Sequence, residues 1–225
     1  MRILIIGCAA ILLVSLPAWA QRTYGYHRNS GNETRPYVGL NLQFNSPTGD
    51  FGNEDIGVLG NGAAQTGTGV ELDVGMASPQ FSAYAGVRGV KFDTDTHDPN
   101  YDAEWTANRF VLGMRGHLFS DRDTNILPTL GGGVTVGQTR LEETFLHPDG
   151  GVEVIKQHSE TSIGWFLEGG MLAYLSPQVA LNANLQYHNY GAHFDPYPLG
   201  SGNFTISHLT LQIGVNVFFS ELYHR

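Results

Sequence analysis

Six charged residues recur at alternating positions among glycine, asparagine, glutamine and serine. They are Glu71, Asp73, Arg88, Arg109, Arg115 and Glu168. Three carboxylates can thus meet three guanidinium groups, and the planar guanidinium fork suits bidentate pairing with a carboxylate where water is scarce. An unpaired buried charge is costly, so the balanced set predicts an ion-paired network in a narrow polar interior. The alternative is that these are ordinary solvated charges on a soluble sheet.

Eight segments of alternating polarity carry these charges. A period of two indicates strands with one apolar face and one polar or small face. The predicted strands are residues 37–44, 69–76, 81–92, 105–119, 126–141, 162–175, 179–188 and 209–219. The last is the clearest, with apolar residues at every odd position and only Phe218 interrupting its polar row. Its length suits a tilted strand that crosses a bilayer, which needs about nine to eleven residues.

The connections between the predicted strands alternate in length. Long connections follow the first, third, fifth and seventh strands, and short ones follow the second, fourth and sixth. In the fifth connection, residues 152–155 can extend a hairpin. Short turns at one end and long loops at the other are typical of outer-membrane barrels. The pattern predicts an all-β fold, an eight-stranded antiparallel up-and-down transmembrane β-barrel with four long surface loops.

The N-terminal region predicts export. Residues 1–20 combine a basic start, an apolar core and a small-residue cleavage site, so we interpret them as a signal peptide. The remaining chain divides into an expected flexible arm at 21–36, the barrel at 37–219 and a short tail at 220–225. Loss of residues 1–20 removes Arg2 and Cys8, leaving 11 basic against 21 acidic residues and no cysteine. This composition argues against disulfides and against nucleic acid as a partner.

Aromatic residues near the predicted strand ends suit the two girdles of a membrane barrel. The candidates are Tyr37, Phe44, Phe81, Trp105, Phe119, Trp165, Tyr187 and Phe219. General strand propensity explains any one of them equally well. An eight-stranded barrel is only wide enough for side chains to fill it, which predicts a plugged lumen rather than a wide pore.

Two motifs carry a family resemblance. Gln212, Gly214, Val217 and Phe219 resemble the C-terminal signal that the barrel-assembly machinery reads, although residues 220–225 follow it here. The first predicted strand and its exit, through residue 52, are also similar to small outer-membrane barrels of the OmpA transmembrane domain and OmpX type. The resemblance implies an outer-membrane location in a Gram-negative-type bacterium. It also implies contact with lipid and lipopolysaccharide, insertion by the assembly machinery, and a monomer.

Catalysis is not expected from these residues. Barrels that resemble the lipid A deacylase family carry a serine two residues after a histidine on a late strand. Here His188 is followed by Asn189 and Tyr190, and a nucleophile needs a base within hydrogen-bond reach. We therefore expect no enzyme, no catalytic residues and no cofactor.

No metal site is expected either. The acidic segment 93–104 departs from an EF-hand loop at its fifth and sixth positions. The nine histidines are scattered, with no close pair on one strand face, which argues against zinc. Loosely bound divalent ions that bridge to lipopolysaccharide phosphates remain open.

The combined hypothesis is an outer-membrane barrel with a largely sealed polar lumen and a structural or surface-interaction role. Three alternatives stay open at this point. They are a narrow channel for small solutes, an outer-membrane lipid-modifying enzyme, and a soluble lipocalin-like barrel that binds a ligand with its apolar face inward.

Overall fold

A computed structural model of the chain describes residues 34–52, 63–94, 100–118, 125–195 and 202–219. Nine strands and one short helix lie in these ranges. In chain order they are β1 (Arg35–Thr48), the 3-10 helix η2 (Gly49–Gly52), β2 (Ala64–Ala77), β3 (Phe81–Thr94), β4 (Tyr101–His117), β5 (Ile126–Leu146), β6 (Val152–His158), β7 (Ser162–Ser176), β8 (Val179–Phe194) and β9 (Gly202–Phe218). No helix in these ranges is long and apolar enough to cross a membrane.

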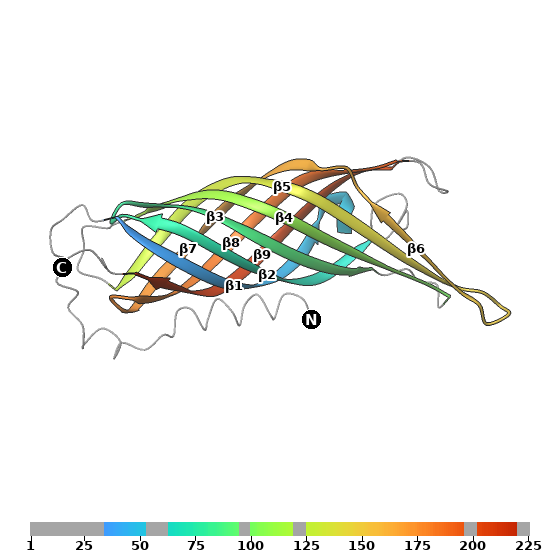
Figure 1. Ribbon diagram of the computed structural model, residues 1–225, viewed down its shortest axis with the longest axis horizontal. Helices are drawn as coiled ribbons and strands as arrows, with labels where there is room; N and C mark the ends of the chain where they lie inside the picture. Colours follow the sequence, from blue (N-terminus) through green and yellow to red (C-terminus); the bar gives the residue numbers. More distant parts are fainter. Residues whose placement is uncertain (1–33, 53–62, 95–99, 119–124, 196–201, 220–225) are drawn as a thin grey trace.

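Eight of these strands close into a barrel (Figure 1). Each of β1, β2, β3, β4 and β5 pairs antiparallel with the next, and β5 then pairs with β7, followed by β8 and β9. The ring closes between β1 and β9, in a register that runs from Tyr37 opposite Phe218 to Thr48 opposite Ser207. Closure leaves these eight strands without a free edge within the wall, which is the condition for a sheet in lipid. The predicted fold class is confirmed.

Alternation along each strand sorts the side chains to two sides of the wall. The apolar row faces outward, with Leu40 56% exposed, Leu112 57% and Ile213 46%. The polar row faces the interior, where Gln43 and Gln212 are buried and lie opposite one another across the closing pair. A lipocalin-like barrel needs the reverse arrangement, with its apolar row inside, so that alternative is wrong.

The strands are longer than the sequence pattern predicted, and β6 forms a strand of its own. β1 begins at Arg35, two residues before the predicted start, and β8 continues to Phe194. β6 pairs only with the last part of β5, from Arg140 opposite His158 to Leu146 opposite Val152. These two strands form a ribbon that projects beyond the barrel at the end away from the β2–β3 and β7–β8 turns (Figure 1). The predicted signal peptide and tail lie outside the described residues.

Candidate functional site in the barrel interior

All six charged residues predicted for the lumen lie inside the barrel. Their relative exposures run from 0% to 5%, and they are Glu71, Asp73, Arg88, Arg109, Arg115 and Glu168. Four of them form two ion pairs, which are joined by amide side chains. Arg109 and Asp73 are held differently, by neutral groups among the described residues.

The first ion pair joins β2 and β3. Glu71 and Arg88 face one another in the antiparallel register, and Arg88 Nε donates to Glu71 Oε2 at 2.7 Å. The second carboxylate oxygen of Glu71 accepts from Gln212 Nε2 at 3.0 Å, which connects the pair to β9. Arg88 also reaches across the lumen to β8, where its Nη2 donates to Gln186 Oε1 at 2.9 Å and its Nη1 lies 2.7 Å from His188 Nε2.

The second ion pair crosses β5 to join β4 and β7. Arg115 donates from Nε to Glu168 Oε1 at 2.7 Å and from Nη2 to Oε2 at 3.2 Å, a bidentate arrangement. Gly131 lies between them in the sheet, as the register partner of both residues. Because Gly131 has no side chain, the guanidinium can extend over β5 to the carboxylate.

Tyr84 completes this second cluster. Its hydroxyl donates to Glu168 Oε1 at 2.9 Å, and Arg115 stacks on its ring with the guanidinium carbon 4.3 Å from the centroid. The ring occupies space above Gly113, where a Cβ atom would lie 2.4 Å from Tyr84 Cζ. The glycine on β4 is therefore a packing requirement of the cluster. Gln186 links both ion pairs, since its Nε2 donates to Glu168 Oε2 at 2.9 Å.

Arg109 lies apart from the carboxylates. It donates to Thr135 Oγ1 at 3.0 Å and to the Ser162 carbonyl at 2.8 Å, and its guanidinium carbon lies 4.0 Å from the Tyr190 ring centroid. Asp73 accepts from Asn41 Nδ2 at 2.7 Å, and its Oδ1 has no hydrogen bond among the described residues. The expectation of one fully ion-paired network is therefore wrong for these two residues. The strand alternation placed them inside but did not define their partners.

Aromatic clusters lie on both sides of the polar layer. At the short-turn end, Phe218 packs against Tyr37 and Tyr174 with both centroid distances at 5.4 Å. At the long-connection end, η2 inserts Phe51 into the interior, 5.2 Å from Phe92 and 5.6 Å from Trp105. Figure 1 shows η2 within this end of the barrel. Each cluster therefore fills part of the lumen with aromatic rings at its end of the barrel.

Two small cavities lie between these layers. One cavity lies beside Tyr37, Arg115 and Phe218, and another is lined by residues that include Arg109, His188 and His208. Each has a volume of about 10 Å³, roughly the room that one water molecule needs. Both ring nitrogens of buried His208 lack a hydrogen bond among the described residues, so the second cavity has polar walls.

Two predicted girdle residues lie inside the barrel instead. Tyr37 is 2% exposed and Trp105 is fully buried, because each occupies an inward position of its strand. Phe44, Phe81 and Trp165 do face outward, at 54%, 48% and 44% exposure. Tyr187 is half-buried and Phe219 is 47% exposed. Phe119 lies outside the described residues.

The four residues of the predicted assembly signal occupy both sides of β9. Gln212 and Gly214 face the lumen, where a Cβ at Gly214 would lie 2.0 Å from Asn41 Oδ1. Val217 is 41% exposed, and the Phe219 amide donates to the Pro36 carbonyl at 2.9 Å. Gln212 and Gly214 thus have packing roles in the folded barrel, and recognition by the assembly machinery stays a prediction.

The closed wall, the outward apolar row and the polar interior define the class of transmembrane β-barrels. The family model of the outer membrane protein beta-barrel domain matches residues 6–219, and the chain belongs to this family. The predicted resemblance and the outer-membrane location are confirmed. No curated protein sequence matches the chain.

The solved structures with a similar fold include two outer-membrane proteins. Neisserial surface protein A is 18% identical, with a TM-score of 0.50, and the match covers 82% of this chain and 97% of that one. A major outer membrane protein from Thermus thermophilus is 12% identical, with a TM-score of 0.54, and the match covers 83% and 99%. At these identities the likeness concerns the fold alone.

Proposed function

We propose that this protein is a largely sealed outer-membrane barrel that acts at the cell surface rather than by conducting solutes. The observation that carries the proposal is the filled lumen. Rings from β1, β7 and β9 cover one side of the polar layer, and rings from η2, β3 and β4 cover the other. Between them the side chains of two ion pairs cross the interior. Cavities of one-water size do not form a path for hydrated solutes.

The long-connection end supplies the surface for such a role, because long loops are extracellular in this architecture. The ribbon of β5 and β6 exposes apolar side chains there, with Leu146 47%, Val152 61% and Val154 46% exposed. Exposed apolar groups outside the membrane often mark interaction sites. The second edge of β6 has no strand partner within the described part of the chain, and a free edge can accept a strand from another molecule.

One exposed ion pair spans this ribbon, and a second lies beside it on β5. Lys156 Nζ lies 3.1 Å from Glu142 Oε1 across the β5–β6 pair, and Arg140 also pairs with Glu142. The hydrogen bond from Lys156, together with both positive charges, lowers the pKa of Glu142. The ribbon thus presents charged side chains together with exposed apolar ones. Such a mixed surface suits contact with a protein or with lipopolysaccharide.

A narrow channel is the second candidate. The polar cavity beside His208 and the unpartnered Asp73 Oδ1 favour it, because both can hold water along the lumen. Conduction would then require the aromatic clusters to move aside. An outer-membrane enzyme has less support, because no serine lies two residues after His188 to act as the nucleophile.

Planar-bilayer recording separates the first two candidates. The purified, refolded protein should give no steady conductance above that of the bare bilayer. The shift in gel mobility between unheated and heated samples verifies that the protein in the same preparation is folded. Stable ohmic steps from the unaltered protein would overturn the proposal and establish a channel.

A further inference from the structure

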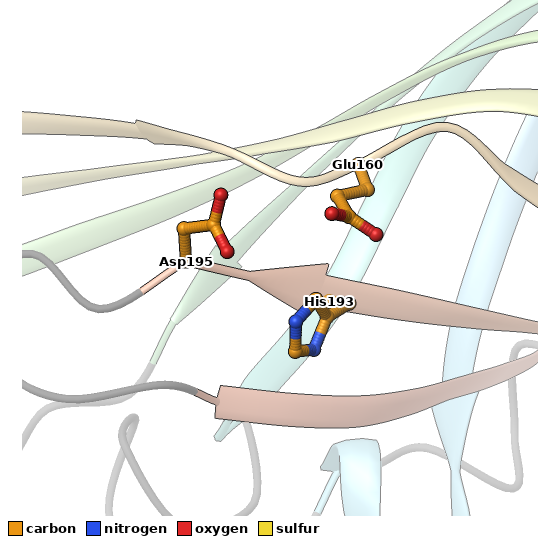
Figure 2. Close-up of side chains that lie close together, drawn as sticks. All are labelled: Glu160, His193 and Asp195. Carbon is orange, nitrogen blue, oxygen red and sulfur yellow. The ribbon is translucent and has the colours of Figure 1, made fainter.

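Three potential metal ligands lie together at the long-connection end. Glu160 precedes β7, His193 lies near the end of β8, and Asp195 follows that strand (Figure 2). One ligand atom from each lies within 4.8 Å of the other two. Glu160 and Asp195 are exposed and His193 is half-buried, so the group is open to ions from solution. Figure 2 shows Glu160 on a separate segment from the other two.

The backbone beside Glu160 is tied to two neighbouring strands. The Glu160 amide donates to the His193 carbonyl at 2.8 Å, which ties the segment before β7 to β8. Ser159 is buried and binds Thr139 of β5 twice, through its own amide at 2.8 Å and through its hydroxyl at 2.9 Å. His193 and Asp195 are two positions apart at the end of β8, and their ligand atoms lie close together. Only side-chain rotation is then needed to bring the three ligands together.

The imidazole already has a supporting partner. His193 Nδ1 lies 2.5 Å from Asn203 Oδ1 on β9. An amide oxygen only accepts hydrogen bonds, so this contact fits the neutral tautomer in which Nδ1 donates and Nε2 is the atom that can bind a metal ion. Metal-binding histidines almost always donate their second ring N–H to such an acceptor, which fixes both the tautomer and the ring orientation. This bond is an observation separate from the proximity of the three ligands.

The donor set defines the class of ion. One neutral imidazole and two carboxylates carry a charge of −2 and offer mixed nitrogen and oxygen donors, which suits Zn²⁺ with water as a further ligand. Ca²⁺ prefers six to eight oxygens. Two ligands at about 2.2 Å from Zn²⁺ can be no more than about 4.4 Å apart. Since all three ligand atoms lie within 4.8 Å of one another, the widest pair needs to approach by at most a few tenths of an ångström, which exposed carboxylates can do by rotation.

We propose that Glu160, His193 and Asp195 bind a divalent transition-metal ion of the Zn²⁺ type at the extracellular end of the barrel. The ion would fasten the connection between β6 and β7 to the end of β8. It would stabilise this end of the barrel, because it binds the folded arrangement and not separated segments.

Calorimetric titration of the untagged, folded full chain in detergent with ZnCl₂ tests the proposal. We expect one Zn²⁺ per chain, and Kd should rise at least tenfold in His193→Ala and in Asp195→Asn. Asn203→Ala should raise Kd by about 10- to 100-fold, as for other partners of ligand histidines. CaCl₂ should bind far more weakly than ZnCl₂ to the unaltered chain.

His147→Ala is the matched control, since His147 is an exposed imidazole on the ribbon paired with Glu153 at 3.2 Å. This variant should bind Zn²⁺ as the unaltered chain does. The ligand residues lie at the rim, so all variants should keep the gel shift of a folded barrel between unheated and heated samples. Absence of saturable Zn²⁺ binding would overturn the proposal, as would equal binding by His193→Ala or loss of binding only in His147→Ala.

Discussion

The ion pair that crosses β5 gives the sharpest test of the interior. In Arg115→Met the carboxylate of Glu168, whose side chain is 1% exposed, loses its bidentate partner. Removing one member of a buried pair costs about 3–5 kcal/mol. Tyr84 and Gln186 still donate to Glu168, each at 2.9 Å, so we expect the lower end of that range. A loss of about 3 kcal/mol is roughly a hundredfold in the folding equilibrium.

Urea unfolding in lipid vesicles, followed by tryptophan fluorescence, measures this change. Arg140→Met is the control, because Arg140 pairs with Glu142 at a partly exposed site and such pairs contribute little. The double variant Arg115→Met/Glu168→Gln should be more stable than Arg115→Met alone, since no unpaired charge is left inside. Equal unfolding midpoints for Arg115→Met and Arg140→Met, or a double variant weaker than the single one, would refute the reasoning.

Three further predictions concern the wall and its packing. Ile213→Arg should lower the free energy of unfolding in vesicles by about 2–4 kcal/mol, because the outward side chain meets lipid near the midplane. Ile213→Leu should be neutral, and equal effects of the two variants would mean that this side chain does not face lipid. Gly113→Ala should lower the free energy of unfolding by about 1–3 kcal/mol, because the new methyl group displaces the ring of Tyr84. Gly116→Ala should have little effect, since its Cβ would lie 3.6 Å from the nearest atom. Equal unfolding midpoints for the two variants would count against this packing. Trp105→Ala should cost about 3–5 kcal/mol, and a change below about 1 kcal/mol would mean the aromatic cluster is loose.

The strand alternation alone predicts much of this fold. It placed all six charged residues on the inward row, and the alternating connection lengths gave the antiparallel ring. The same alternation also places Tyr37 and Trp105 inside, in phase with Asn41 and with Arg109. An aromatic residue near a strand end suits either side of the wall, so nearness to the end does not by itself place it in a girdle. The place of a residue in the inward and outward alternation predicts its side of the wall better than its nearness to the strand end.

Partners across the lumen could not be predicted from the sequence. Arg115 and Glu168 are 53 positions apart and meet only because the inward residue between them is Gly131. Arg109 has a similar neighbour in Gly137, yet the residue beyond it is Ser162, so its guanidinium meets no carboxylate within the part of the chain that the structure describes. These contacts depend on strand register, which a single sequence does not specify. The grouping of Glu160 with His193 and Asp195 likewise depends on the fold, because the segment before β7 meets the end of β8 only in the closed barrel.

One row of side chains faces lipid and the other fills the lumen, and two tryptophans test this arrangement directly. The sequence has three, and Trp19 lies in the predicted signal peptide. Trp165 faces outward and is 44% exposed, whereas Trp105 faces inward and is fully buried. In vesicles of brominated lipid, Trp105→Phe, which retains Trp165, should be quenched several-fold more strongly than Trp165→Phe. Equal or stronger quenching of Trp105 would contradict the account.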